Sequence, residues 1–106
     1  MSVSLEQMLK ELAKAEQARD LLSEVERRLS AGNTDLENLL RQLEQLGESL
    51  PESDPIGLLI EEAVGAARTR DSIKAGSDVS RSRSAIEGEI SSLRGAIQSV
   101  QARSDL

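Results

Sequence analysis

The stretch Gly47-Glu48-Ser49-Leu50-Pro51-Glu52-Ser53-Asp54-Pro55 lies at the middle of this 106-residue chain, between two long helical patterns. Gly47 is expected to end the first of them, because glycine takes positive φ without a Cβ clash. Pro51 and Pro55 lack an amide donor, and each disfavours helix in the residue before it. Asp54 followed by Pro55 is typical of an N-cap and a first helical residue. The stretch therefore ends one helical arm and begins another.

The two arms predict an all-α fold in a single domain, residues 1–106. The first arm covers about residues 4–46, the loop 47–55, and the second arm about 56–103. The simplest arrangement is an antiparallel helical hairpin with kinked arms, which completes a four-helix bundle by dimerisation. Each arm would be on the order of 70 Å long if it were fully helical. The alternative is a compact three- or four-helix bundle.

A seven-residue repeat of apolar residues runs through the first arm. It consists of Met8, Ala15, Leu22, Leu29, Leu36, Leu43 and Leu50. Such a period is typical of a seam between helices that lie side by side, and we assign Leu22, Leu29, Leu36 and Leu43 to it.

The segment 31–37 interrupts the first arm, because Gly32 suits a helix C′ position and Thr34 with Glu37 fits a capping box. The repeat continues in phase across the interruption. A kinked continuous rod is therefore the first expectation, and two helices that meet at a corner is the second.

The second arm carries the clearest apolar seam of the chain at its C-terminal end. The seam residues there are Ile86, Ile90, Leu93, Ile97 and Val100. The apolar pattern fades over residues 68–71 and is disturbed again at residues 75–78, which include Gly76. In an antiparallel hairpin, the breaks at Gly32 and Gly76 fall at similar heights, so both arms can bend together.

Composition limits the classes of function. The chain has no Phe, Tyr or Trp, so a compact core lacks its largest side chains and a rod or bundle is favoured. The formal net charge is −6, with ten acids and six bases in residues 1–50 and nine and seven in residues 51–106. This balance excludes nucleic acid as a main partner. No apolar run is long enough to span a bilayer, and we expect a protein that is cytoplasmic, or exported without a cleaved signal peptide.

The residues that most enzymes use are missing. There is no His and no Cys, which removes the commonest general base, the thiolate nucleophile and the usual zinc ligands. Neighbouring acids such as Glu61 and Glu62, or Glu87 and Glu89, do not repeat the spacing of a carboxylate metal bundle. Phosphate-binding loops are also missing. We therefore expect no catalytic residues, cofactor, metal or small-molecule substrate.

The run Arg81-Ser82-Arg83-Ser84 has the composition of a nucleic-acid or phosphorylation motif. It lies within a helical pattern and has no aromatic neighbours on which bases could stack. We interpret its residues as the exposed side of an amphipathic helix.

Small residues form a continuous stripe on the side of the last helix opposite its seam. We name Ala85, Gly88, Ser92, Gly95, Ser99 and Ala102 the small-residue stripe. Glycine inside an exposed helix costs roughly 1 kcal/mol relative to alanine, yet it occurs here twice. Small residues at this spacing allow another helix backbone to approach closely. Either the stripe is a surface that docks a partner, or it is an ordinary exposed face.

The length, the central loop and the pattern Gly76…Ile86…Gly88…Ile97 resemble the small WxG-type helical-hairpin proteins associated with type VII secretion. The chain lacks the Trp-x-Gly turn and the tyrosine-containing export signal of that family. The resemblance implies a non-enzymatic helical hairpin that pairs with itself or with a larger client.

These observations predict a non-catalytic helical protein–protein interaction module with a protein partner, a homo-oligomer, or both. A secretion-associated partner or targeting protein for a larger client is one form of it. The alternative is a coiled-coil structural or scaffolding subunit of a larger assembly.

Overall fold

The computed structural model describes residues 5–32, 35–69 and 72–104. These residues form four helices and no strand, so the all-α prediction is confirmed. The helices are α1 (Leu5–Ser30), α2 (Glu37–Glu48), α3 (Pro55–Ala67) and α4 (Ser72–Ser104).

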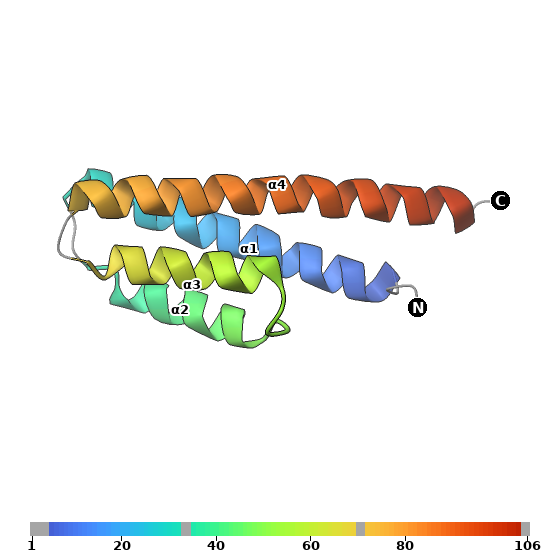
Figure 1. Cartoon of the computed structure of the whole chain (residues 1–106), viewed down its shortest axis with the longest axis horizontal. Helices are drawn as coiled ribbons and strands as arrows, with labels where there is room; N and C mark the ends of the chain where they lie inside the picture. Colours follow the sequence, from blue (N-terminus) through green and yellow to red (C-terminus); the bar gives the residue numbers. More distant parts are fainter. Residues whose placement is uncertain (1–4, 33–34, 70–71, 105–106) are drawn as a thin grey trace.

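The break after α1 is a reversal of the chain. Gly32 has φ +74°, a conformation that glycine adopts without strain, and its amide donates to the Leu29 carbonyl at 3.1 Å. From there α2 runs back along the molecule (Figure 1). The expectation of a kinked continuous rod is therefore wrong, and the chain adopts the corner. Thr34 lies outside the described residues, and Leu36 occupies the N-cap of α2 with no side-chain cap.

The central stretch reverses the chain as predicted. Asp54 caps α3 by accepting the amide of Ile56 at 2.9 Å, and Pro55 stands in the first turn of that helix. A turn closed by the Asp54 amide and the Pro51 carbonyl, at 3.0 Å, precedes it. Gly47 is not the residue that ends α2, since the helix continues to Glu48 and Gly47 does not take positive φ. The backbone polar groups at the helix end are paired instead through Ser49, whose hydroxyl donates to the Leu46 carbonyl.

The second arm breaks between Ala67 and Ser72. The expected break at Gly76 is wrong, because α4 continues through it without interruption. A single glycine lowers helix propensity by only about 1 kcal/mol, and buried Ala75 and Val79 on either side hold this turn of α4 in the core.

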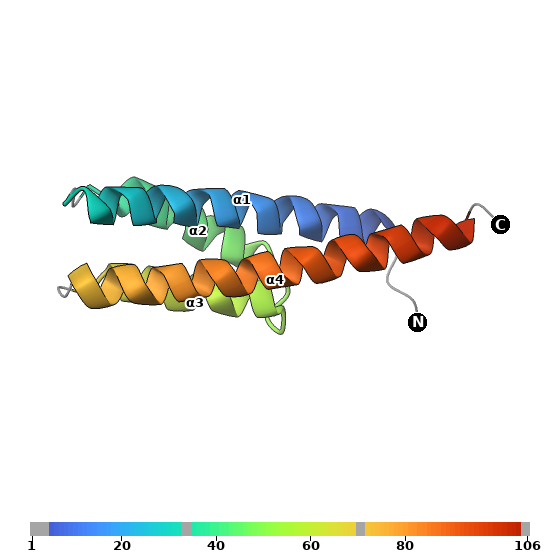
Figure 2. The same ribbon diagram turned by 90° about the horizontal axis from the view of Figure 1, so that it is seen from above.

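Together the helices form an elongated bundle. Arg83 pairs with Glu26 and Arg94 with Glu16, so α4 runs antiparallel to α1. The shorter α2 and α3 form a second antiparallel pair that covers only one end of the long pair (Figures 1 and 2). The extents are 53 × 21 × 18 Å, and the radius of gyration of 15.2 Å exceeds the roughly 13 Å of a compact domain of this size. The longest dimension falls short of the expected 70 Å because each arm folds back on itself.

The core lies where all four helices overlap. Its side chains are aliphatic, and the largest that are almost fully buried are Leu22, Leu43, Ile56, Ile60 and Ile86. Ala15 and Ala18 of α1 are fully buried too. Because their side chains are small, α1 can lie close to its neighbours at this level.

We expect Leu43→Ala to lower the free energy of unfolding by about 2–5 kcal/mol, because it leaves a cavity among all-aliphatic neighbours. Leu58→Ala is the matched control, since 52% of the Leu58 side chain is exposed, and it should cost about 1 kcal/mol or less. Urea unfolding followed by far-UV circular dichroism measures both. Equal costs for the two variants would contradict the position of the core.

Candidate interaction surfaces

The predicted seam residues lie in or next to the core. Leu22, Leu36, Leu43, Ile86, Ile90 and Ile97 are buried, and Leu29, Leu93 and Val100 are half-buried. Leu22 and Leu43 belong to different helices that run in opposite directions, so the repeat does not mark one continuous seam.

The α1–α4 pair extends beyond the α2–α3 hairpin. Lys14 donates to the Ser49 carbonyl at 3.0 Å, and the Glu11 carboxyl contacts that of Asp54, so the central turn lies at the level of these α1 residues. The segments from this level to the end of the long pair are residues 5–12 of α1 and 90–103 of α4, and we name them the stalk. It is a two-helix segment without the second layer that covers the rest of the pair (Figure 2).

The stalk keeps apolar surface in solvent. Leu9 is 46% exposed, one of two large hydrophobic side chains with that much exposure among the described residues. Five more are only half-buried: Leu5, Met8, Leu12, Leu93 and Val100. Only Ile90 and Ile97 of the large apolar stalk residues are buried. A two-helix segment of this kind gains stability when further helices cover it.

The small-residue stripe is exposed along its whole length. All six of its residues are exposed, and Ala85 also borders a depression between α3 and α4. A Cβ added at Gly88 or Gly95 would meet no atom within 4 Å. Packing within the chain therefore does not require glycine at either position, and the docking role of the stripe stays a prediction.

If the stripe is solvated in the free protein, the double variant Gly88→Ala, Gly95→Ala should raise the free energy of unfolding by roughly 1–2 kcal/mol. The gain comes from better helix propensity and a less flexible unfolded chain. Thermal unfolding at several protein concentrations measures it. A lower stability together with a lower oligomer mass would instead mean that these glycines contact another helix.

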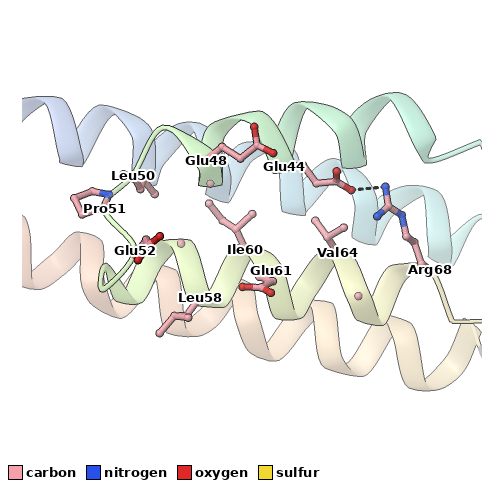
Figure 3. A pocket seen from close by; sticks show the side chains of 13 residues that line it. Glu44, Glu48, Leu50, Pro51, Glu52, Leu58, Ile60, Glu61, Val64 and Arg68 are labelled. Atoms are coloured by element: carbon pink, nitrogen blue, oxygen red, sulfur yellow. Dashed lines mark ion pairs between the residues drawn. The ribbon is translucent and has the colours of Figure 1, made fainter.

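Sequence reasoning missed a groove on the outer side of the α2–α3 hairpin (Figure 3). The α2–α3 groove holds about 660 Å³ and is open to solvent. Ile60 and Val64 of α3 point toward α2 at its floor, and Leu50 closes its end at the central turn. Leu58 lies at its outer edge with 52% of its side chain exposed. The signal in the sequence was the side of α3 formed by Gly57, Glu61 and Gly65, because two residues without side chains leave a hollow beside the carboxylate.

The net charge of the protein belongs to this hairpin. Residues 37–67 contain seven acids and one base, Arg41, whereas the rest of the chain contains twelve of each. The hairpin thus carries a formal charge of −6, and the remainder of the protein is neutral. Counting acids and bases separately in residues 1–50 and 51–106 does not show this concentration of charge, because the acidic segment spans the midpoint of the chain.

Three acids from different elements meet where the hairpin joins the long pair. Asp54, 8% exposed, contacts Glu11 of α1, and Glu89 of α4 lies close to Glu11. The hydrogen bond to Asp54, burial, and the negative charges of Asp54 and Glu89 raise the pKa of Glu11 to about 7. Below neutral pH the Glu11 carboxyl therefore holds a proton, which it donates to the carboxylate of Asp54.

This raised pKa gives the stability a pH dependence. Between about pH 4.5, the ordinary pKa, and pH 7, folded Glu11 holds a proton that the unfolded chain releases. The free energy of unfolding therefore falls as pH rises through this interval, by on the order of 1–3 kcal/mol. We expect Glu11→Gln, which is uncharged at every pH, to lose this part of the dependence.

Urea unfolding at pH 5 and pH 8 measures the effect in both proteins. Glu6→Gln is the control, because Glu6 is an exposed α1 acid paired with Lys10 at 3.5 Å. An unchanged difference in unfolding free energy between the two pH values in Glu11→Gln would contradict the proton held by Glu11.

The Arg81–Ser84 run is not a uniformly exposed face. Ser82 is buried, and Arg83 is half-buried and paired with Glu26 and Glu87. The expectation that all four residues are exposed is therefore wrong, since this side of α4 packs against α1 and α3.

Among the described residues, no group of three or more acids has the arrangement of a metal site. Within the same residues, none of the four helices combines the length and the apolar content that crossing a membrane requires.

Comparison with known proteins finds no match among family profiles, curated proteins or solved structures.

Proposed function

We propose that this protein is a non-catalytic helical protein–protein interaction module that self-associates through its stalk. The observation that supports this most is the exposed apolar surface of the stalk, with Leu9 at 46% exposure. The stalk needs a partner that offers an apolar helical surface of similar length, and a second copy of the chain offers one.

The geometry of the stalk suits a symmetric pair. Its two helices run in opposite directions, so a copy rotated by 180° sets α1 of one chain beside α4 of the other. Two such stalks form a four-helix bundle, which is the arrangement that α2 and α3 already give the other end of each chain. Pairing the stalks would bury apolar surface, which stabilises the folded state by about 25 cal/mol per Å². The single chain has a core without aromatic residues and therefore a low stability of its own, so this contribution matters.

A finer role follows from the sequence resemblance to WxG-type proteins. In that role the module is a secretion-associated partner or targeting protein that stays with a larger client. What supports it is the length of the chain and the turn at its centre. The alternative, a scaffolding subunit, needs contacts that continue beyond a closed pair.

Self-association predicts a thermal midpoint that rises with protein concentration, as mass action requires when the folded state is an oligomer. We expect Leu9→Glu to remove this dependence and to give the monomer mass in sedimentation equilibrium. The variant should stay helical, because Leu9 lies outside the core.

Leu58→Glu is the matched control, since it places the same charge at a similarly exposed leucine on α3, away from the stalk. It should keep the oligomer mass of the parent. A parent protein that is monomeric and has one thermal midpoint from low to high micromolar concentration would refute self-association. A mass that grows without limit would instead support the scaffolding subunit.

A further inference from the structure

We propose that two copies of this protein exchange their α2–α3 hairpins, so that the hairpin of each chain packs on the α1–α4 pair of the other. In the closed chain, by contrast, the hairpin covers its own long pair. The exchange takes place at the end of the molecule opposite the stalk and does not depend on self-association through the stalk.

The hairpin is attached to the long pair at one end only. α1 ends and α2 begins at the end of the molecule where α3 ends and α4 begins (Figure 1). An ion pair of 3.2 Å joins Arg68, which follows α3, to Glu37, the first residue of α2. The central turn, at the other end of the hairpin, has no covalent connection to α1 or α4. The two connections can therefore act as hinges for the hairpin as a unit.

The surface that the hairpin covers is matched by the hairpin of any copy. Ile56, Ile60 and Val64 of α3 are at most 4% exposed. They share one core with Val79 and Ile86 of α4, which are fully buried. A hairpin that swings away exposes both sides of this aliphatic core to water, which the hydrophobic effect opposes. A second copy removes this cost, because its hairpin makes the same contacts with the same residues.

Gly32 holds the reversal between α1 and α2. Its φ of +74° is the one positive φ among the described residues, and residues with a Cβ disfavour this conformation. A Cβ at Gly32 would meet no atom within 4 Å, so the backbone conformation alone favours glycine here. In the exchanged pair α2 leads away from its own α1, and Gly32 no longer has to take positive φ. Replacing Gly32 therefore destabilises the closed chain and spares the exchanged pair.

The leucine repeat keeps its phase across this connection. Leu29 near the end of α1 and Leu36 before α2 are one heptad apart, and the spacing continues to Leu43. A reversal does not require this spacing, because the helices on either side of it run in opposite directions. Two helices that follow each other in one direction do require it to keep their apolar sides aligned. The exchanged pair accounts for the repeat, whereas the single chain adopts the corner.

Exchange and stalk contact use opposite ends of the molecule. Each joins two identical chains by a two-fold axis, and two different two-fold contacts on one chain generate an open linear assembly. The exchange thus supplies the continuing contact that a scaffolding subunit needs. This consequence rests on the proposed stalk contact, whereas the exchange itself does not.

A cross-link between the hairpin and the long pair identifies the exchange. The Lys14 Nζ of α1 contacts the Ser49 carbonyl of the central turn at 3.0 Å, and the chain contains no cysteine. Lys14→Cys with Ser49→Cys, bridged by a short bismaleimide, links one chain to itself when the hairpin is closed and two chains when it is exchanged. Leu9→Glu is included to remove the stalk contact. After refolding at high micromolar concentration we expect covalent dimers on a denaturing gel, and fewer at low concentration.

A pair of glycine variants tests the hinge. In the Leu9→Glu protein, Gly32→Ala should lower the dissociation constant of the exchanged pair at least about tenfold, because positive φ disfavours alanine in the closed chain only. Gly65→Ala is the matched control, since it adds the same methyl within α3, where a Cβ meets nothing within 4 Å, and it should leave the constant unchanged. Sedimentation equilibrium measures both. X-ray scattering should give the exchanged pair about twice the 53 Å length of the closed chain.

The proposal is overturned if cross-links form only within single chains at every concentration and in both glycine variants, or if Gly32→Ala and Gly65→Ala give the same mass. Inserting Gly-Ser-Gly-Ser after Gly32 lengthens the connection and interrupts the repeat, so it should abolish the covalent dimers and keep the closed chain helical. Covalent dimers that persist at the same level would also overturn it. An exchanged pair whose mass is the same with and without Leu9→Glu would refute the stalk contact and leave the exchange intact.

Discussion

The antiparallel packing of α1 against α4 supports the rest of the structure. Ala15, Ala18, Leu22 and Val25 of α1 are fully buried, and Val79, Ile86 and Ile90 of α4 face the same core. Ion pairs from Glu16 to Arg94 and from Glu26 to Arg83 flank this interface and fix its direction. The α2–α3 hairpin rests on this pair, and the unequal lengths of the two pairs create the stalk.

The two pairs divide the physical properties of the molecule between them. The long pair and its connections have no net formal charge and present apolar surface at the stalk, whereas the short hairpin carries the whole formal charge of −6 and a groove lined by four glutamates. Neutral apolar surfaces suit contact between identical chains, because like charges do not oppose each other there. Acidic surfaces suit partners of the opposite charge. One chain of 106 residues thus offers two surfaces with different requirements.

The junction between the pairs depends on a few polar groups. Asp54 both caps α3 and contacts Glu11 of α1, so one buried carboxyl connects the start of the hairpin helix to the long pair. Lys14 reaches the Ser49 carbonyl at the same level. Because Glu11 must hold a proton to donate to Asp54, the attachment of the hairpin is linked to pH.

The sequence by itself determined the helices, the central reversal and the apolar positions. Asp54 and Pro55 specify a helix start through local backbone chemistry, and a seven-residue repeat places Leu22 and Leu43 on buried sides whichever way their helices run. For that same reason the repeat could not distinguish a continuous rod from a reversal at Gly32. The interruption at residues 31–37 is compatible with a kinked rod and with a reversal. Only the packing of α2 on α3 and on the long pair decided between them.

The sequence alone could not predict which apolar and acidic side chains form exposed surfaces, for a related reason. The exposure of Leu9 depends on how short α2 and α3 are, and four glutamates of residues 37–67 line one groove only when α2 and α3 lie side by side. Periodicity states which side of a helix is apolar. Whether another helix covers that side is decided by tertiary packing, since coverage depends on neighbours that are distant in the chain.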